Sequence, residues 1–141
     1  MDDRLIELLE RVVVGSVAVT ERAIAAAGTD LTFVQWRVLL IVGEQPDGAT
    51  VSEVASRIGA RGSPASRLIS RLKRRGVVIA ERDPSDGRVA RIQLTESGRS
   101  LRGRVLEQRR RSLDALATAI SFTELERETL RQVATALASF T

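Results

Sequence analysis

Two short helices separated by a tight turn constrain the fold more than any other feature of this sequence. Thr50 and Glu53 have the spacing of a capping box, which predicts the start of the first helix. Ser63, followed by a proline, is the predicted N-cap of the second helix, and Gly76 ends it. Residues 50–75 therefore have the spacing of a helix-turn-helix motif.

The second of these helices has two chemically different faces. Helical periodicity predicts an aliphatic stripe made of Ala65, Leu68, Ile69 and Leu72. The opposite face holds only hydroxyl and guanidinium groups, from Ser63, Arg67, Ser70 and Arg74, with Ser66 and Arg71 at its edges. A merely solvated helix usually mixes charges of both signs, because such pairs stabilise it. A face without acids suits phosphates and guanine edges instead, and it favours DNA binding.

A β-hairpin is predicted directly after this helix. Residues 77–80 form a β-branched run, and residues 90–94 alternate apolar and polar side chains. At the turn between them, Gly87 is expected to adopt a positive φ, and Asp86 is expected to pair with Arg88 or a nearby arginine. A hairpin in this place is a wing, whose tip arginine can enter the neighbouring minor groove.

Positive charge is concentrated in this part of the chain. Residues 61–91 carry nine arginines and lysines against three carboxylates, a net charge of +6, whereas the whole chain carries +4. Such a segment indicates a polyanion-binding face. The alternative is a winged helix that binds an acidic protein partner, which would show no preference for a DNA sequence.

Composition excludes several other classes of function. The chain contains no cysteine, histidine or tyrosine. Their absence excludes thiol chemistry, nucleophiles activated by histidine, and metal sites built from cysteine or histidine. No constellation of carboxylates stands out either, so we predict no enzyme activity, no cofactor and no metal site.

Long apolar helices flank the winged motif. Helices are predicted over residues 3–27 and 95–120, and a last one follows a capping box at Thr123 and Glu126. These helices are too apolar to stand free, which predicts a homodimer with an interface formed by Leu5, Leu8, Leu9, Val12, Leu130, Val133 and Leu137. Acidic residues near the N-terminus and the lack of a long apolar run predict a cytoplasmic chain that does not enter a membrane.

Three stretches carry a family resemblance: "LTFVQWRVL", "TVSEVASRIGARGSPASRLISRLKRRGVV" and "RDPSDGRVARIQLTESG". In this order they resemble the MarR family of bacterial transcriptional regulators, over essentially the whole chain. The resemblance implies a mainly α fold with a small β-hairpin. It also implies a single domain over residues 1–141, in which residues 31–98 form a winged helix-turn-helix lobe and residues 1–30 and 99–141 form dimerisation helices. It also implies a homodimer that binds pseudo-palindromic double-stranded DNA. Most members are repressors that a small aromatic or phenolic effector releases.

The resemblance assigns roles to individual residues. The helix from Ser63 would be the recognition helix, and Arg88 would be the arginine that enters the groove. The predicted DNA contacts are Ser52, Arg61, Ser63, Pro64, Ala65, Ser66, Arg67, Ser70, Arg71, Arg74, Asp86, Gly87 and Arg88. Gly87 and Ala80 stand where the family often has arginine, which weakens the expected wing contribution. Trp36 is a candidate effector contact, although a helix aromatic at such a position is more often part of the core.

Overall fold

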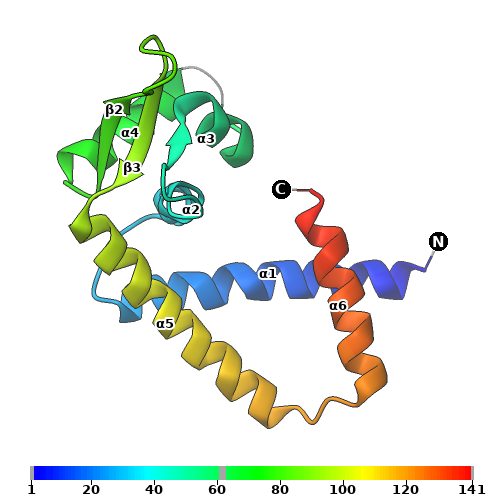
Figure 1. Ribbon diagram of the computed structural model, residues 1–141. Coiled ribbons are helices and arrows are strands. Elements are labelled where there is room, and N and C mark those ends of the chain that lie inside the picture. Colours follow the sequence, from blue (N-terminus) through cyan, green and yellow to red (C-terminus); the bar gives the residue numbers. More distant parts are fainter. Residues whose placement is uncertain (1, 61–62, 141) are drawn as a thin grey trace. The chain divides into compact units, whose positions relative to one another are not determined.

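The computed structural model describes residues 2–60 and 63–140, with the backbone alone at Ser63. In chain order, the elements of the described residues are α1 (Asp3–Ala26), α2 (Phe33–Val42), β1 (Ala49–Thr50), α3 (Val51–Ile58), α4 (Ser63–Arg74), β2 (Val78–Arg82), β3 (Ala90–Leu94), α5 (Glu96–Ala119) and α6 (Glu124–Ala138) (Figure 1). The protein is mainly α-helical with one small sheet, and the predicted fold class is confirmed.

Local capping groups set the ends of the helices. Three threonines each accept a hydrogen bond from the backbone amide of the third residue of the helix that follows, and the side chain of that residue accepts one from the threonine amide; they are Thr32, Thr50 and Thr123. Gly59 and Gly76 follow α3 and α4 with φ angles of 71° and 76°. Glycine adopts this left-handed conformation at little steric cost, so both helices end where the sequence predicts.

The three strands form an antiparallel sheet in the order β1-β3-β2. The predicted hairpin is confirmed as β2 and β3, which pair from Val78 opposite Leu94 to Arg82 opposite Ala90. The sequence predicts only these two strands. The additional strand, β1, has two residues and pairs Ala49 with Ile92 on the other edge of β3.

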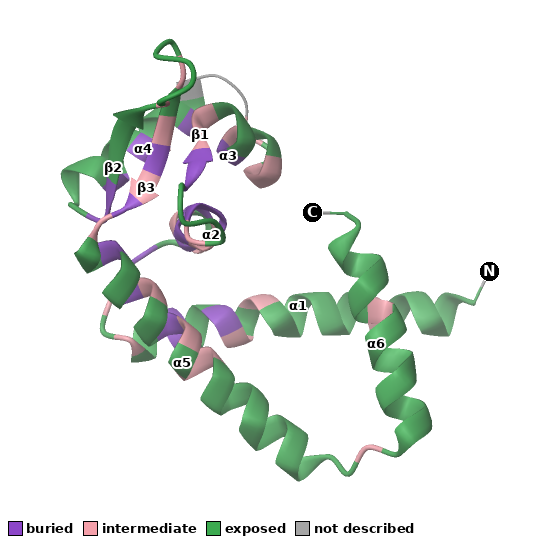
Figure 2. Cartoon of the chain, viewed as in Figure 1, coloured by how far each residue is buried: buried purple, intermediate pink, exposed green. Residues whose placement is uncertain are grey.

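The hydrophobic core lies inside the winged lobe and extends to α1 and the start of α5 (Figure 2). Helix α2 contacts α1, α3, α4 and β3, and its Trp36 and Leu39 are fully buried. Leu72 of α4 and Ile92 of β3 join the same cluster. The interpretation of Trp36 as a core residue is therefore right, with the guanidinium of Arg109 at 5.8 Å from the centre of its ring.

The chain divides into two compact units, one up to Arg109 and one from Arg110 onward. The first unit holds α1 to α4, the sheet and the first part of α5, and the second unit holds the remainder of α5 and α6. The division at 1–30, 31–98 and 99–141 stays a prediction. Within the described part of the chain, no helix is both long and apolar enough to cross a membrane.

Candidate nucleic-acid interface

Helix α4 presents the two faces that its sequence predicts. On one side, Ala65, Ile69 and Leu72 are buried, and Leu68 packs against the core. The other side exposes Pro64, Ser66, Arg67, Ser70, Arg71 and Arg74. The aliphatic stripe therefore fixes which side of α4 is free. The predicted contact at Ala65 is corrected, because its methyl group lies on the core side with no exposed surface.

The turn before α4 is described only in part. Arg61, a predicted DNA contact, lies outside the described residues, and so does the side chain of Ser63. Ser63 is itself the first residue of α4. Ser52 is exposed in the first turn of α3, so it remains available as a predicted contact.

The arginines near this face fall into two groups. Arg57 and Arg75 are paired within the protein, with Glu44 and with Asp30 respectively. The hydrogen bonds from Arg57 lower the pKa of Glu44, so this carboxylate stays charged. By contrast, the exposed arginines of α4 form no ion pair with any residue that the structure describes. We refer to Ser66, Arg67, Ser70, Arg71 and Arg74 as the basic face of α4.

The wing tip is held by its aspartate. The Asp86 carboxylate accepts a hydrogen bond from the Arg88 amide at 3.0 Å, and the Asp86 carbonyl accepts one from the Val89 amide at 3.0 Å. Asp86 thus caps the backbone, and the predicted pairing with an arginine side chain is wrong for the described residues. The predicted positive φ of Gly87 is also wrong, because this capped turn needs no left-handed residue. Arg88 itself is exposed.

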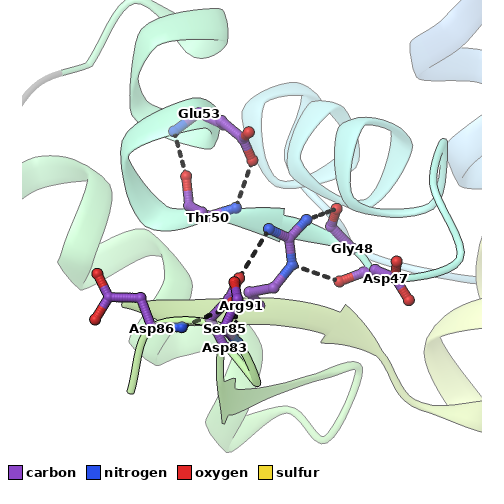
Figure 3. A network of polar contacts seen from close by, with 8 residues as sticks. All are labelled: Asp47, Gly48, Thr50, Glu53, Asp83, Ser85, Asp86 and Arg91. Atoms are coloured by element: carbon purple, nitrogen blue, oxygen red, sulfur yellow. Dashed lines mark hydrogen bonds and ion pairs between the residues drawn. The ribbon is translucent and has the colours of Figure 1, made fainter. Parts of the chain in front are cut away.

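A second set of contacts fixes the base of the wing loop (Figure 3). One carboxylate oxygen of Asp83 accepts from the Ser85 amide at 2.8 Å and from the Ser85 hydroxyl, and the other lies 3.3 Å from Nη1 of Arg91. Arg91 also donates from Nε to the Asp47 carbonyl and from Nη2 to the Gly48 carbonyl, each at 3.1 Å. Hydrogen bonds from Ser85 are the main cause that lowers the pKa of Asp83 to about 2, and Arg91 adds to them.

Sequence reasoning missed Asp83 and Arg91 as residues of this site. Their signal in the sequence is slight, since an acid and an arginine eight residues apart sit on opposite sides of a loop. The two carbonyls that Arg91 contacts lie more than forty residues earlier in the chain. The pairing of β1 with β3 brings the Arg91 side chain next to these two carbonyls.

The arrangement of these elements matches known proteins. The sequence profile of the MarR family matches residues 29–89. The chain is 34% identical over 103 residues to the HTH-type transcriptional regulator TtmR of Methylorubrum extorquens (strain PA1), an alignment that covers 63% of this chain and 52% of that protein. The structure of CouR from Rhodococcus jostii RHA1 bound to p-coumaroyl-CoA has 28% identity and a TM-score of 0.77, covering 94% of this chain and 88% of that one.

The chain is similar to the MarR family in sequence over residues 29–89 and in fold over nearly its whole length. A further relative is the HTH-type transcriptional repressor IacR of Pseudomonas putida, which is 35% identical over 69 residues, covering 49% of this chain and 41% of that protein. The chain thus spans about half the length of the curated relatives that it matches. In MarR terms, α3 and α4 form the helix-turn-helix motif, and β2 and β3 form the wing.

Proposed function

We propose that this protein is a dimeric transcriptional repressor that binds a pseudo-palindromic site in double-stranded DNA. The observation that carries the proposal is the basic face of α4, which is exposed, free of carboxylates and free of ion pairs with the described residues. A helix of this kind in the second position of a helix-turn-helix enters the major groove. The exposed Arg88 on the adjacent wing suits the minor groove beside it. We expect such a regulator in the cytoplasm, where the DNA is.

Dimerisation is supported by apolar side chains that each unit leaves exposed. In α1, Leu5, Leu8 and Val12 are 53%, 57% and 55% exposed. In the second unit, Leu130 and Leu137 are 49% and 42% exposed. Exposed aliphatic side chains in such rows are typical of a surface that a partner chain covers. We therefore propose that both rows, together with Leu9 and Val133, belong to the interface between two copies of this chain.

An effector site is supported by a cavity beside the wing. It has a volume of about 570 Å³, within the usual range for small ligands, and its lining comes from the end of α2 and the turn after it, the end of β3, and the start of α5. Arg99 and Arg102 contribute positive charge, and the one carboxylate of the lining, Glu44, is paired with Arg57. Nε of Arg102 is buried without a hydrogen-bond partner among the described residues. Arginine pairs suit carboxylate or phosphate groups. We propose that a small anionic aromatic or phenolic effector binds here.

A binding assay against the DNA that flanks this protein's own gene tests the main proposal. Fluorescence anisotropy at about 0.05 and 0.2 M salt should give a preference of at least 1,000-fold over random DNA, as is usual for specific sites. A protein-interaction module with a basic surface would bind both DNAs equally and weakly. Equal affinities would therefore contradict the proposed function and favour that alternative.

A further inference from the structure

The side chain of Arg91 connects the wing to the body of the helix-turn-helix lobe. Arg91 lies in β3, and its side chain is 23% exposed. Each of its three nitrogens donates a hydrogen bond: Nε to Asp47, Nη2 to Gly48 and Nη1 to Asp83. A guanidinium that donates from each of its three nitrogens inside the protein is held in place, and it is poorly placed to contact phosphate as well.

Asp83 continues this connection toward the tip of the wing. Its carboxylate is 15% exposed and accepts from the Asp86 amide at 3.3 Å in addition to the contacts of Ser85 and Arg91. Asp86 in turn accepts from the Arg88 amide. A series of hydrogen bonds therefore runs from the turn before β1, through Arg91 and Asp83, to the Asp86 amide (Figure 3). The bond between the Asp86 carboxylate and the Arg88 amide extends it to the backbone of Arg88.

The same turn sets the start of the helix-turn-helix motif. Gly48 has a φ of 72°, and a Cβ atom at this position would lie 1.9 Å from the carbonyl oxygen of Ile92, so the turn is pressed against β3. Two residues later, Thr50 caps α3 through its bonds with Glu53. The contacts of Arg91 thus attach the wing to the segment from which α3 begins.

We propose that Arg91 and Asp83 are positioning residues, which hold the wing at a fixed orientation to the helix-turn-helix and so place Arg88 for the minor groove before DNA arrives. The proposal rests on the proposed DNA-binding function. Its physical basis is pre-organisation: a loop that is already ordered loses less conformational entropy on binding. Lysine has a single nitrogen and cannot donate from three positions in one plane, so Arg91→Lys should behave like Arg91→Ala.

A double-mutant cycle on operator DNA tests this relation. The variants are Arg88→Ala, Arg91→Ala and the double variant, and each is titrated with salt in the full-length protein. Arg88→Ala should lower the slope of log affinity against log salt by about 1.8 per dimer, at 0.9 for each of two wings. Arg91→Ala alone should produce more than half of that change. When Arg88→Ala is already present, adding Arg91→Ala should change neither the salt slope nor the affinity further.

The controls separate positioning from folding and from general charge loss. Arg104→Ala removes one exposed arginine of α5, which belongs neither to α4 nor to the wing, and its slope should equal that of the wild type. Asp83→Asn keeps the size of the side chain and leaves the hydrogen bonds from Arg91 to the two backbone carbonyls in place. It should therefore lower the salt slope only when Arg88 is present, and it tests the proposal even if Arg91→Ala fails to fold. Additive losses of Arg88→Ala and Arg91→Ala, or an unchanged slope in both Arg91→Ala and Asp83→Asn, would overturn the proposal. A wild type that binds no operator would instead contradict the proposed function.

Discussion

Gly87 offers a change that should strengthen DNA binding. Its backbone has no positive φ, and an added Cβ atom would meet nothing within 4 Å. Gly87→Arg should therefore be accommodated without strain at the turn that Asp86 caps. Replacing glycine in a compatible conformation reduces the entropy of the unfolded chain, so stability should rise by about 0.5 kcal/mol rather than fall.

The expected gain can be worked out from the position of this residue. Gly87 is exposed beside Arg88, so a guanidinium here is close enough to the same groove to displace one further counterion. At about 0.9 per contact and two wings per dimer, the log–log salt slope should become steeper by about 1.8. When salt is raised from about 0.05 to 0.2 M, the variant should lose roughly ten times more of its operator affinity than the wild type does.

Salt titration of operator binding measures this slope directly. Gly87→Ala is the matched control, because it makes the same backbone change without the charge. Thermal unfolding of all three proteins shows whether the turn tolerates a side chain. If Gly87→Arg and Gly87→Ala give parallel lines, the wing tip does not approach DNA, and the basic face of α4 alone carries the binding.

Four other changes test separate parts of the structure. Arg67→Ala should weaken operator binding by about 1–3 kcal/mol and relax sequence preference in anisotropy assays, whereas equal losses on random DNA would make Arg67 a phosphate contact. Leu72→Ala should lower the free energy of unfolding by about 2–5 kcal/mol in denaturant titrations, because Leu72 is fully buried; a loss below 1 kcal/mol would contradict its core role. Leu8→Asp should give a folded monomer by light scattering, since the charge meets water in the monomer and would be buried in the dimer; a monomeric wild type at micromolar concentration would refute the interface. The low pKa of Asp83 means that its charge stabilises the folded wing above about pH 4 and that this contribution is lost as pH falls toward 2. A carboxyl NMR titration of Asp83 with a midpoint near pH 4 would contradict those contacts.

The helix boundaries could be predicted because their causes are local. A capping box needs only a threonine and an acid or amide three residues later, as at Thr50 and Glu53. The ends of α3 and α4 depend on single glycines that adopt a positive φ. The two faces of α4 follow in the same way from the order of side chains along one helix, so burial of Ile69 and exposure of Arg67 agree with the pattern.

The strand β1 could not be predicted from a local pattern. Two residues are too few to show the alternation of a strand, and Ala49 and Thr50 also lie at the start of a helix. They form a strand only because Ile92 and Arg91 lie opposite them, more than forty residues later in the chain. This pairing is also what brings the turn at Gly48 within reach of the Arg91 side chain.

The wing tip shows why an identified motif need not disclose its geometry. The Asp-Gly-Arg sequence suggests a glycine turn and an acid paired with the arginine side chain, and both expectations fail for the same reason. Asp86 uses its carboxylate on the Arg88 amide, which closes the turn without a positive φ at Gly87 and leaves the Arg88 guanidinium exposed. An aspartate paired with the guanidinium would offset the positive charge that a wing arginine offers to DNA. An aspartate that caps the backbone instead fixes the direction of the chain at Arg88 and leaves its positive charge free, which is the arrangement that a wing needs.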